Sequence, residues 1–576
     1  MLKTLLPYAK KYLPFVILTP LCIVGEVLLE TRIPVLMSNI VDIGIPAQNI
    51  SYIIQVGLSM ILMALCSLAF GALASVFGAR AGMGFAAELR KGMFNRIQDY
   101  SFANIDKFST SSLVTRLTTD VNRVQMAFMM TLRVAVRAPL MLVVSTFMAF
   151  SINAKLVAVF LAAIPFLAVC LGVIATKTYP RFRAMMKKFD FMNATVQENL
   201  VAIRVVKAFV RGDHEIEKFD EALDELQDYS IRAEKILAFN GPIMQITMYS
   251  CIIAILWFGG NQIVVGNMQT GELMAFISYV TQILSSLMMI TMIFIQMVMS
   301  RASMQRIAEV LTEEIDVNDD HADASLQPED GSIVFEDVSF SYYKDPNNTV
   351  LDNINLEIKS GETVGIIGGT GSSKTTLVQL IPRLYDTLGG RVLVGGHDVK
   401  DYKLDTLRGA VGMVLQKNVL FSGSINSNLR WGDADASVED IRSACQDAQA
   451  DDFITSFPEG YETDLGQGGV NVSGGQKQRL CIARALLKKP KIIILDDSTS
   501  AVDTATDAKI RAAFREKLAD TTTIIIAQRI SSVADADKII VMDDGKINGI
   551  GTHEELIKTN DIYREVYESQ QEGAKA

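Results

Sequence analysis

Apolar residues in the first half of the chain gather in six long runs, whereas those in the second half alternate with polar residues over shorter distances. The runs cover roughly residues 15–37, 54–79, 135–152, 156–176, 239–264 and 273–299. A helix needs about 20 mostly apolar residues to cross a bilayer. The third run is short, but it continues a helical pattern that begins before it. The pattern therefore predicts an all-α domain of six membrane helices over residues 1–308.

The segments around these runs predict how the domain is oriented. Met1 to Pro14 alternates Leu and Tyr with Lys and is typical of an amphipathic helix on a membrane surface. The first run follows Lys10 and Lys11 and is long enough to span, unlike a cleavable signal peptide. Residues 33–79 and 259–272 contain no Lys or Arg, whereas the segments between the second and third and between the fourth and fifth runs contain many. Because positive charges mark the cytoplasmic side, both termini and these two segments are expected there, as helices that leave the membrane and turn back.

The second half of the chain predicts a different fold. An acidic stretch from Glu313 to Glu329 indicates an exposed linker, which we place at residues 309–330. Strand-like apolar runs then alternate with helical ones up to the C-terminus, the pattern of an α/β domain over residues 331–576.

Composition narrows the class of protein. Apolar residues make up 49% of the 576 residues and charged residues 20%, and the mean hydropathy is +0.27. This balance excludes a disordered chain and a secreted disulfide scaffold. A net charge of −10 argues against a nucleic-acid partner. The six cysteines show neither a C-x-x-C spacing nor a disulfide pattern, so reduced packing residues are expected.

The first candidate for chemistry is a glycine loop between a predicted strand and a predicted helix. Backbone N–H groups in such a loop, with the following helix N-terminus, surround phosphate oxygens. Lys374 would reach the β- and γ-phosphates of ATP, and the hydroxyl of Thr375 would hold Mg²⁺. Ser373 stands where this P-loop pattern has Gly, so a simple glycine-rich turn is the alternative. The predicted phosphate-binding residues are Gly368, Gly369, Thr370, Gly371, Ser372, Ser373, Lys374, Thr375 and Thr376.

Two later segments strengthen this prediction. Ile492 to Leu495 is an apolar strand that ends in Asp496 and Asp497, and an acid delivered by a buried strand suits a Walker B aspartate that binds Mg²⁺. Between the two lies VSGGQKQR, residues 472–479, which opens a helix.

The VSGGQ segment resembles the signature of ATP-binding cassette (ABC) transporters, usually written LSGGQ, and the other motifs follow in the family's order. Tyr342 matches the aromatic residue that stacks on adenine, Gln416 the Q-loop glutamine at the catalytic Mg²⁺, and residues 500–503 the D-loop. Six spans and one cassette resemble an exporter half-transporter: an all-α transmembrane domain fused to an α/β P-loop cassette. The resemblance implies two cassettes that close head to tail around two ATP molecules. The residues expected to contact the partner's ATP are Ser473, Gly474, Gly475, Gln476 and Asp503. It also implies short coupling helices, for which Ser109–Arg116 and Leu200–Phe209 are the candidates.

Two catalytic positions depart from the family pattern. Asp497 stands where active cassettes have Glu, and its carboxylate is one methylene shorter. A general base must come within about 2.6–3.2 Å of its proton, directly or through one water. Gln528 replaces the switch histidine that contacts the γ-phosphate, and glutamine cannot become cationic. The chain thus resembles the degenerate-site subunit of bacterial heterodimeric multidrug exporters. This implies a partner half-transporter with the Walker B Glu and the switch His. Neutral drift, with Asp497 still active, is the alternative.

The membrane runs offer candidates for substrate contact. Glu26, Glu30 and Arg32 are ionisable groups in an apolar run, and they could touch a substrate or form a helix–helix ion pair. One face of the last run carries flexible methionines and an amide, which suit varied ligands or ordinary packing. These residues are Met288, Met292, Gln296 and Met299. Together they favour hydrophobic or amphipathic compounds, next to membrane lipid.

The sequence leaves other functions open. A homodimeric lipid or drug exporter with Asp497 as the working base would share these motifs, as would a regulatory or channel-like ATP-binding subunit. The short segment before the first run has no room for a peptidase domain, and importers generally carry membrane and ATPase parts on separate chains. The expected location is a bacterial cytoplasmic membrane, with the ATPase domain in the cytoplasm.

Overall fold

The computed structural model of the chain describes residues 1–497 and 503–575. The chain forms two compact units. The membrane unit comprises Met1–Gln98 and Ser111–Thr312, and the cassette unit comprises Asp99–Thr110 and Glu313–Ala576.

The membrane unit consists of long helices that are joined by short helical segments. Among the described residues, six helical segments are long and apolar enough to cross a membrane, which confirms the predicted number. The long helices continue well beyond the apolar runs, since α4 ends at Gln98 and α8 at Val201. The helices are α1 (Leu2–Leu5), η1 (Leu6–Tyr12), α2 (Leu13–Glu30), α3 (Ile33–Asn39), η2 (Ile40–Gly44), α4 (Ile50–Gln98), α6 (Thr110–Thr115), η3 (Arg116–Asp120), α7 (Val121–Ile152), α8 (Ala154–Val201), α9 (Ile203–Ala208), α10 (Gly212–Leu237), α11 (Asn240–Val264) and α12 (Thr270–Thr312).

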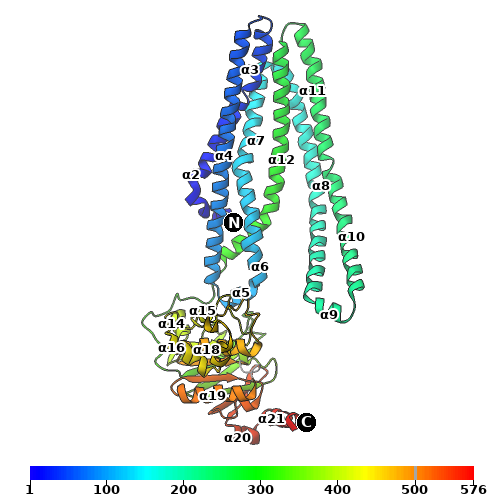
Figure 1. Cartoon of the computed structure of the whole chain (residues 1–576). Coiled ribbons are helices and arrows are strands. Elements are labelled where there is room, and N and C mark those ends of the chain that lie inside the picture. The colour runs from blue at the N-terminus through cyan, green and yellow to red at the C-terminus, as the bar shows by residue number, and fades with distance from the viewer. Residues whose placement is uncertain (498–502, 576) are drawn as a thin grey trace. The chain divides into compact units, whose positions relative to one another are not determined.

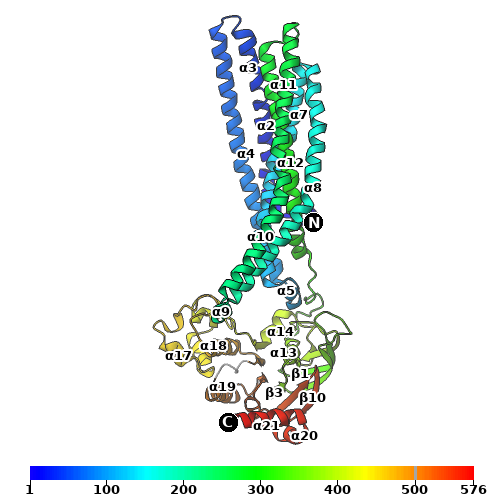
Figure 2. The ribbon, with the colours of Figure 1, turned by 90° about the vertical axis from the view of Figure 1, so that its right-hand side faces the viewer.

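The long helices pack against one another in pairs. Helix α2 packs along α4, and α7 packs along α12. Helix α8 runs beside α10 and α11, and the short α9 joins α8 to α10 at one end of this pair (Figures 1 and 2). The α9 tip leaves apolar side chains exposed, with Val205 at 57% and Phe209 at 72% exposure.

The N-terminal segment differs from the single amphipathic helix that the sequence predicts. It consists of one turn of α-helix, α1, and the 3-10 helix η1, because Pro7 lies in the first turn of η1 and cannot donate a helical hydrogen bond. The segment packs on α4. Tyr8 and Tyr12 lie so close to Gly92 and Gly84 that a Cβ on either glycine would meet the rings at 2.2 and 2.3 Å. Lys11 also bonds Glu88 of α4 at 2.7 Å.

The cassette unit contains two sheets. The first has the order β2-β1-β4-β5 and is antiparallel, and the second has the order β10-β9-β3-β8-β7-β6 and is parallel except for the β9–β10 pair. Because the carboxyl ends of parallel strands meet at one edge, the loops after β3, β6, β7 and β8 come together. The strands are β1 (Ile333–Phe340), β2 (Leu351–Ile358), β3 (Thr363–Gly368), β4 (Gly389–Val394), β5 (His397–Asp398), β6 (Val411–Val414), β7 (Ile492–Asp496), β8 (Thr522–Ile526), β9 (Lys538–Asp543) and β10 (Lys546–Gly551).

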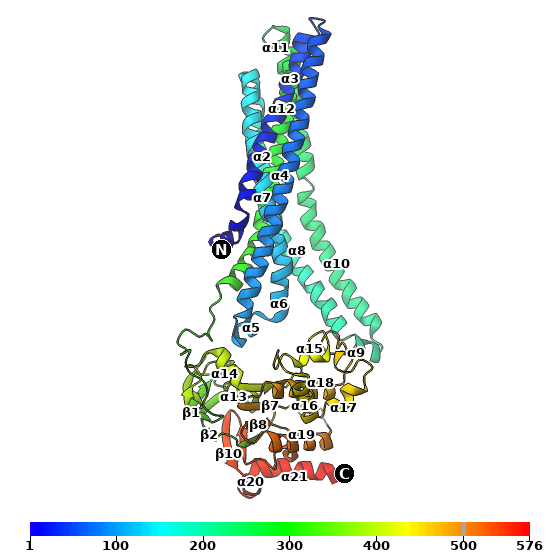
Figure 3. The same cartoon turned by 60° about the vertical axis from the view of Figure 1, so that its left-hand side comes forward.

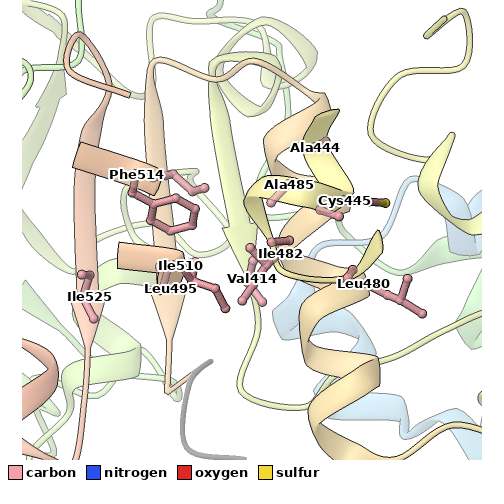
Figure 4. Packing of buried hydrophobic residues seen from close by; sticks show 14 of the residues in the cluster. Val414, Ala444, Cys445, Leu480, Ile482, Ala485, Leu495, Ile510, Phe514 and Ile525 are labelled. Atoms are coloured by element: carbon pink, nitrogen blue, oxygen red, sulfur yellow. The ribbon is translucent and has the colours of Figure 1, made fainter. Parts of the chain in front are cut away.

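Helices cover the parallel sheet and hold its edge in place. Figure 4 shows the core where β6, β7 and β8 meet α16, α18 and α19, with Ile482, Leu495 and Phe514 among the packed side chains. The parallel strands are buried along their length and therefore read as continuous apolar runs. The helices of this unit are α5 (Phe102–Phe108), α13 (Lys374–Gln379), α14 (Leu404–Ala410), α15 (Ile425–Leu429), α16 (Val438–Asp447), α17 (Asp451–Ser456), η4 (Gly460–Glu462), α18 (Gly474–Leu487), α19 (Thr504–Lys517), η5 (Ile530–Ser532), α20 (His553–Thr559) and α21 (Asp561–Lys575).

Helix α5 belongs to the cassette unit although it comes from the first half of the chain (Figure 3 labels it). Ser101 caps it by a reciprocal hydrogen-bonded box with Asn104. The Tyr385 hydroxyl donates to Asp106 Oδ2 at 2.8 Å, and the Tyr385 ring contacts Phe102. The segment that packs on the cassette thus lies before the predicted Ser109–Arg116, most of which continues into α6 and η3 of the membrane unit. The Ser101–Asn104 capping box sets where α5 begins, and Phe102, the first residue of the helix, contacts the cassette.

The acidic stretch is held along the cassette. Residues 309–312 are still part of α12, so the membrane unit ends at Thr312 rather than at the predicted residue 308. Beyond it, Val317 is buried, and the Asp323 N–H donates to the Asp401 carbonyl at 2.8 Å. Lys491 Nζ donates to the Glu329 carbonyl at 2.7 Å.

Candidate nucleotide-binding site

The glycine loop turns between β3 and α13 by left-handed backbone conformations. Gly371 has φ +88° and Ser373 has φ +68°. At Gly368, a Cβ would meet the Met542 carbonyl oxygen at 2.2 Å, so only glycine fits. Ser373 adopts the conformation for which the P-loop pattern has Gly, and the left-handed region costs a residue with a Cβ about 1–2 kcal/mol. The departure from the pattern therefore leaves the turn intact at a modest cost.

The side chain of Lys374 folds back onto this loop. Its Nζ donates to the carbonyls of Gly368 at 2.8 Å and Gly369 at 2.7 Å, and to Ser372 Oγ at 3.1 Å. Burial lowers the pKa of Lys374, while the nearby Asp497 and Asp496 act in the opposite direction. The ammonium thus lies beside backbone N–H groups and a helix N-terminus, an arrangement that can receive a phosphate.

Asp496 presents a carboxylate oxygen that suits a hard cation. Thr375 Oγ1 donates to Asp496 Oδ1 at 3.0 Å. Asp496 Oδ2 is buried and has no hydrogen-bond partner in the described part of the chain. Burial raises the pKa of Asp496, and the neighbouring Asp497 adds to this effect. A hydroxyl beside an unpaired buried carboxylate oxygen offers the ligands that Mg²⁺ prefers, so these residues fit the ion.

The two residues that depart from the family pattern contact each other. Gln528 Nε2 donates to Asp497 Oδ2 at 2.7 Å. Asp497 follows β7 with φ +48°, and its N–H donates to the Ile526 carbonyl at the end of β8. Because β7 and β8 are neighbours, the turn after each brings its polar residue to the same point.

Tyr342 lies beside the P-loop helix. Its hydroxyl forms a 2.9 Å hydrogen bond with Thr376 Oγ1. Phe340 and Tyr385 contact its ring in edge arrangements, and the side chain remains 39% exposed. A partly exposed aromatic ring held next to the P-loop can receive a base.

Gln416 lies in the loop that follows β6. Its side chain is exposed, and Val414 pairs with Leu495 just before Asp496. The sheet therefore brings Gln416 to the same edge as Asp496.

The signature residues open α18, as the sequence predicts. Ser473 caps this helix, accepting from the Gln476 N–H, and its own N–H donates to Gln476 Oε1 at 2.9 Å. Gly474 and Gly475 form the first turn. Asp503 caps α19 by accepting from the Thr506 N–H at 2.9 Å, and this backbone hydrogen bond lowers the pKa of Asp503. The other D-loop residues, 500–502, lie outside the described residues.

In the membrane unit, the acidic residues of α2 pair with an arginine of α7. Arg137 Nη2 bonds Glu30 Oε2 at 2.8 Å, and Arg137 Nη1 bonds Glu26. Arg32, which the sequence analysis grouped with these acids, forms no ion pair with them among the described residues. The geometry is that of the helix–helix ion pair considered above, with a partner from another helix.

A cavity of about 180 Å³ lies beside Arg137. Its lining combines one ion pair with an amide, hydroxyls and two methionines. Gln282 accepts from the Ser145 hydroxyl at 2.8 Å. The lining residues are Glu30, Arg137, Ala138, Met141, Thr281, Gln282, Ser285, Ser286 and Met289.

The predicted methionine face of α12 lies elsewhere. Met288, Met292 and Met299 are exposed, Gln296 is half-buried, and none of the four lines the cavity. Sequence reasoning missed Arg137 and Gln282. A signal for Arg137 was present, because it is a cation inside the third apolar run.

Comparisons with known proteins agree with this arrangement. Residues 16–307 match the family "ABC transporter transmembrane region", and residues 351–500 match the family "ABC transporter". The chain is 39% identical over 546 residues to the uncharacterized ABC transporter ATP-binding protein YfiB of Bacillus subtilis (strain 168), covering 95% of this chain and 94% of that protein. It is 33% identical over 496 residues to the ATP-dependent lipid A-core flippase of Desulfotalea psychrophila (strain LSv54 / DSM 12343), with 85% of each covered.

A solved structure, described as a bacterial Atm1-family ABC exporter with ATP bound, shares the fold. It superposes with a TM-score of 0.83 at 25% identity and covers 97% of this chain and 98% of the other. One transmembrane region followed by one ATP-binding domain is the half-transporter arrangement, and ABC exporters work as dimers. The chain therefore belongs to the ABC transporter family, as an exporter-type half-transporter that joins a six-helix transmembrane domain to an ATP-binding cassette.

Proposed function

We propose that this chain is one subunit of a heterodimeric exporter, whose own P-loop binds ATP and hydrolyses it slowly. The contact between Gln528 Nε2 and Asp497 Oδ2 carries this proposal. A general base has to present its carboxylate to a water, and loss of such assistance costs about 10²–10⁴ in rate. Here the shorter carboxylate accepts a hydrogen bond from a neutral amide instead of standing beside a histidine.

The remaining parts of the cassette support binding without fast turnover. Lys374, Thr375 and Asp496 are arranged to hold phosphate and Mg²⁺. Ser473 and Gln476 form a closed capping box, and this surface would complete the partner's site. In the heterodimer, the partner supplies the Walker B glutamate and the switch histidine for that second site. Two copies of this chain alone would carry two weak sites.

The test is a paired measurement on the full chain, purified alone in lipid. We expect bound ATP at a stoichiometry near one per chain, together with turnover that is about 10²-fold or more below that of a competent exporter. Turnover comparable to a competent exporter, abolished by Asp497→Asn, would contradict the proposal and make the chain a homodimeric pump with Asp497 as its base. A regulatory or channel-like subunit would bind ATP but give no ATP-dependent transport with any partner.

For the substrate, we propose hydrophobic or amphipathic compounds. The cavity beside Arg137 combines methionine side chains with a few polar groups, the balance usual in sites for small organic ligands. Efflux selectivity should change on Gln282→Ala and not on Met292→Ala, since only Gln282 lines the cavity. The reverse result would return the site to the exposed face of α12. Because one relative is a lipid A-core flippase, labelled lipid belongs in the same assay, and transport of lipid alone would favour a lipid exporter.

The proposed location is a bacterial cytoplasmic membrane, with both termini and the cassette in the cytoplasm. The Lys and Arg residues between the second and third and between the fourth and fifth spans support this orientation. Accessibility labelling of a cysteine placed at Gln48, in the loop between η2 and α4, tests it. Labelling from the outside of intact cells is expected.

A further inference from the structure

The last helix of the chain, α21, contacts the segment that carries Gln528. The Gln570 side-chain amide exchanges two hydrogen bonds with the backbone on either side of Arg529. Its Nε2 donates to the Gln528 carbonyl at 2.8 Å, and its Oε1 accepts from the Ile530 N–H at 2.9 Å. A single side chain thus bonds the backbone before and after one residue, which fixes the direction of the chain there.

Helix α21, which carries Gln570, is packed firmly on the rest of the cassette. Tyr563 is fully buried, and its hydroxyl lies 2.8 Å from His553 Nδ1 of α20. Val566 and Tyr567 pack on the cassette core. Gln570 lies seven residues after Tyr563, and residues at this spacing share one face of a helix. The face that anchors the helix to the core is therefore the face that points Gln570 at the loop after β8.

The segment that Gln570 holds lies at the triphosphate end of the nucleotide site. Gln528 bonds Asp497, and the preceding Asp496 accepts a hydrogen bond from Thr375, the residue after Lys374. A P-loop lysine reaches the β- and γ-phosphates. A shift of the Gln528 backbone would therefore move groups beside the γ-phosphate and leave the base and the α-phosphate untouched.

We propose that Gln570 is a positioning residue for the nucleotide site: by holding the backbone of Gln528 and Ile530, α21 sets how the site distinguishes a triphosphate from a diphosphate. This inference rests only on the binding of ATP by the cassette. It is independent of how fast the bound ATP is hydrolysed.

The experiment measures ATP and ADP affinities of the full chain in lipid, by displacement of a fluorescent nucleotide in the presence of Mg²⁺. Gln570→Leu keeps the approximate size of the side chain and removes both hydrogen bonds. Since each bond contributes a modest net free energy, we expect a three- to tenfold weaker ATP affinity, roughly, with ADP affinity unchanged within about twofold. Gln571→Leu is the matched control, because the neighbouring amide bonds only the Tyr567 hydroxyl, at 3.4 Å, among the contacts that the structure records for it.

A second variant separates the two hydrogen bonds. Gln570→Glu keeps an acceptor for the Ile530 N–H and loses the donor to the Gln528 carbonyl. Hydrogen exchange should show the Ile530 amide still protected in this variant and exposed in Gln570→Leu, while both lose ATP affinity selectively. If ATP and ADP affinities fall together, Gln570 only supports the fold. If neither changes, or Gln571→Leu has the same effect, the proposal is wrong.

Discussion

Among single residues, Asp497 and Gln528 are the two on which the proposed slow hydrolysis of ATP depends. Each departs from the residue that the sequence pattern of the family predicts at its position, and the two are joined by a 2.7 Å hydrogen bond. Because the two side chains are in contact, the effects of substituting each of them on ATP turnover are not expected to be additive. In Asp497→Glu alone, the longer carboxylate would still lie beside the amide of Gln528. In Gln528→His alone, the histidine would lie beside the shorter carboxylate of Asp497.

The double variant Asp497→Glu with Gln528→His should therefore raise ATP turnover by at least about tenfold over the unmodified chain, in line with the rate that a general base contributes. Each single variant should give much less. The measurement is phosphate release by the full chain in lipid, with Lys374→Ala in the double variant as the control for hydrolysis at the P-loop. Equal rates for the double variant and either single variant would contradict the coupling.

At the scale of elements, α5 shows how a short segment from the first half of the chain becomes part of the cassette unit. The Tyr385 hydroxyl donates to Asp106, the Asn104 side chain donates to the Glu314 carbonyl, and Phe102 lies against the Tyr385 ring. These contacts join α5 to the start of the acidic stretch and to the residues after α13. Tyr385 therefore contacts both α5 and the ring of Tyr342.

Tyr385→Phe removes only the hydroxyl of this contact. A hydrogen bond to a charged group is worth about 1.5–3 kcal/mol when buried, and less is expected here because Asp106 is exposed. The amides of residues 102–108 should exchange with deuterium several-fold faster, while those of β7 keep their rates. Asp106→Asn retains an acceptor and should have a smaller effect. Unchanged exchange in α5 would mean that its docking depends on Phe102 and the capping box.

A second prediction at this scale concerns the ion pairs between α2 and α7. Removing Arg137 would leave Glu26 and Glu30 as two uncompensated charges at membrane depth. Breaking a fully buried pair in this way costs about 3–5 kcal/mol, and less is expected here because all three side chains are only partly buried. Arg137→Met should lower the thermal midpoint in lipid by several degrees. Adding Glu26→Gln and Glu30→Gln should restore most of the loss, because the charges are then removed together. A triple variant as unstable as Arg137→Met would show that packing of the arginine stem matters more than its charge.

For the molecule as a whole, the features that depend on local sequence were predictable, and those that depend on distant pairing were not. The six spans follow from the length of helix that a bilayer requires, and the P-loop, Walker B and signature segments carry residue types that their geometry demands. The partner of Glu26 and Glu30 was missed because Arg137 lies on another helix and only packing brings it near. The position of α5 and the contact of Gln570 with the loop after β8 depend on tertiary packing in the same way.

The whole chain also explains why a partner is proposed. In the membrane unit the α9 tip exposes apolar side chains, and in the cassette unit the signature residues form an ordered capping box at the start of α18. ABC exporters work as dimers, and the proposed weak site is the reason for proposing that the second subunit is a different chain.

The identity of the nucleotide that stays on this chain tests the central claim most directly. The full chain in lipid would be incubated with Mg²⁺ and ATP, separated from free nucleotide, and sampled over time for bound ATP and ADP. The slow site that we propose predicts mainly intact ATP after many minutes, and rapid conversion to ADP in the variant Asp497→Glu with Gln528→His. Prompt conversion to ADP on the unmodified chain, prevented by Asp497→Asn, would contradict it and identify Asp497 as a working catalytic base.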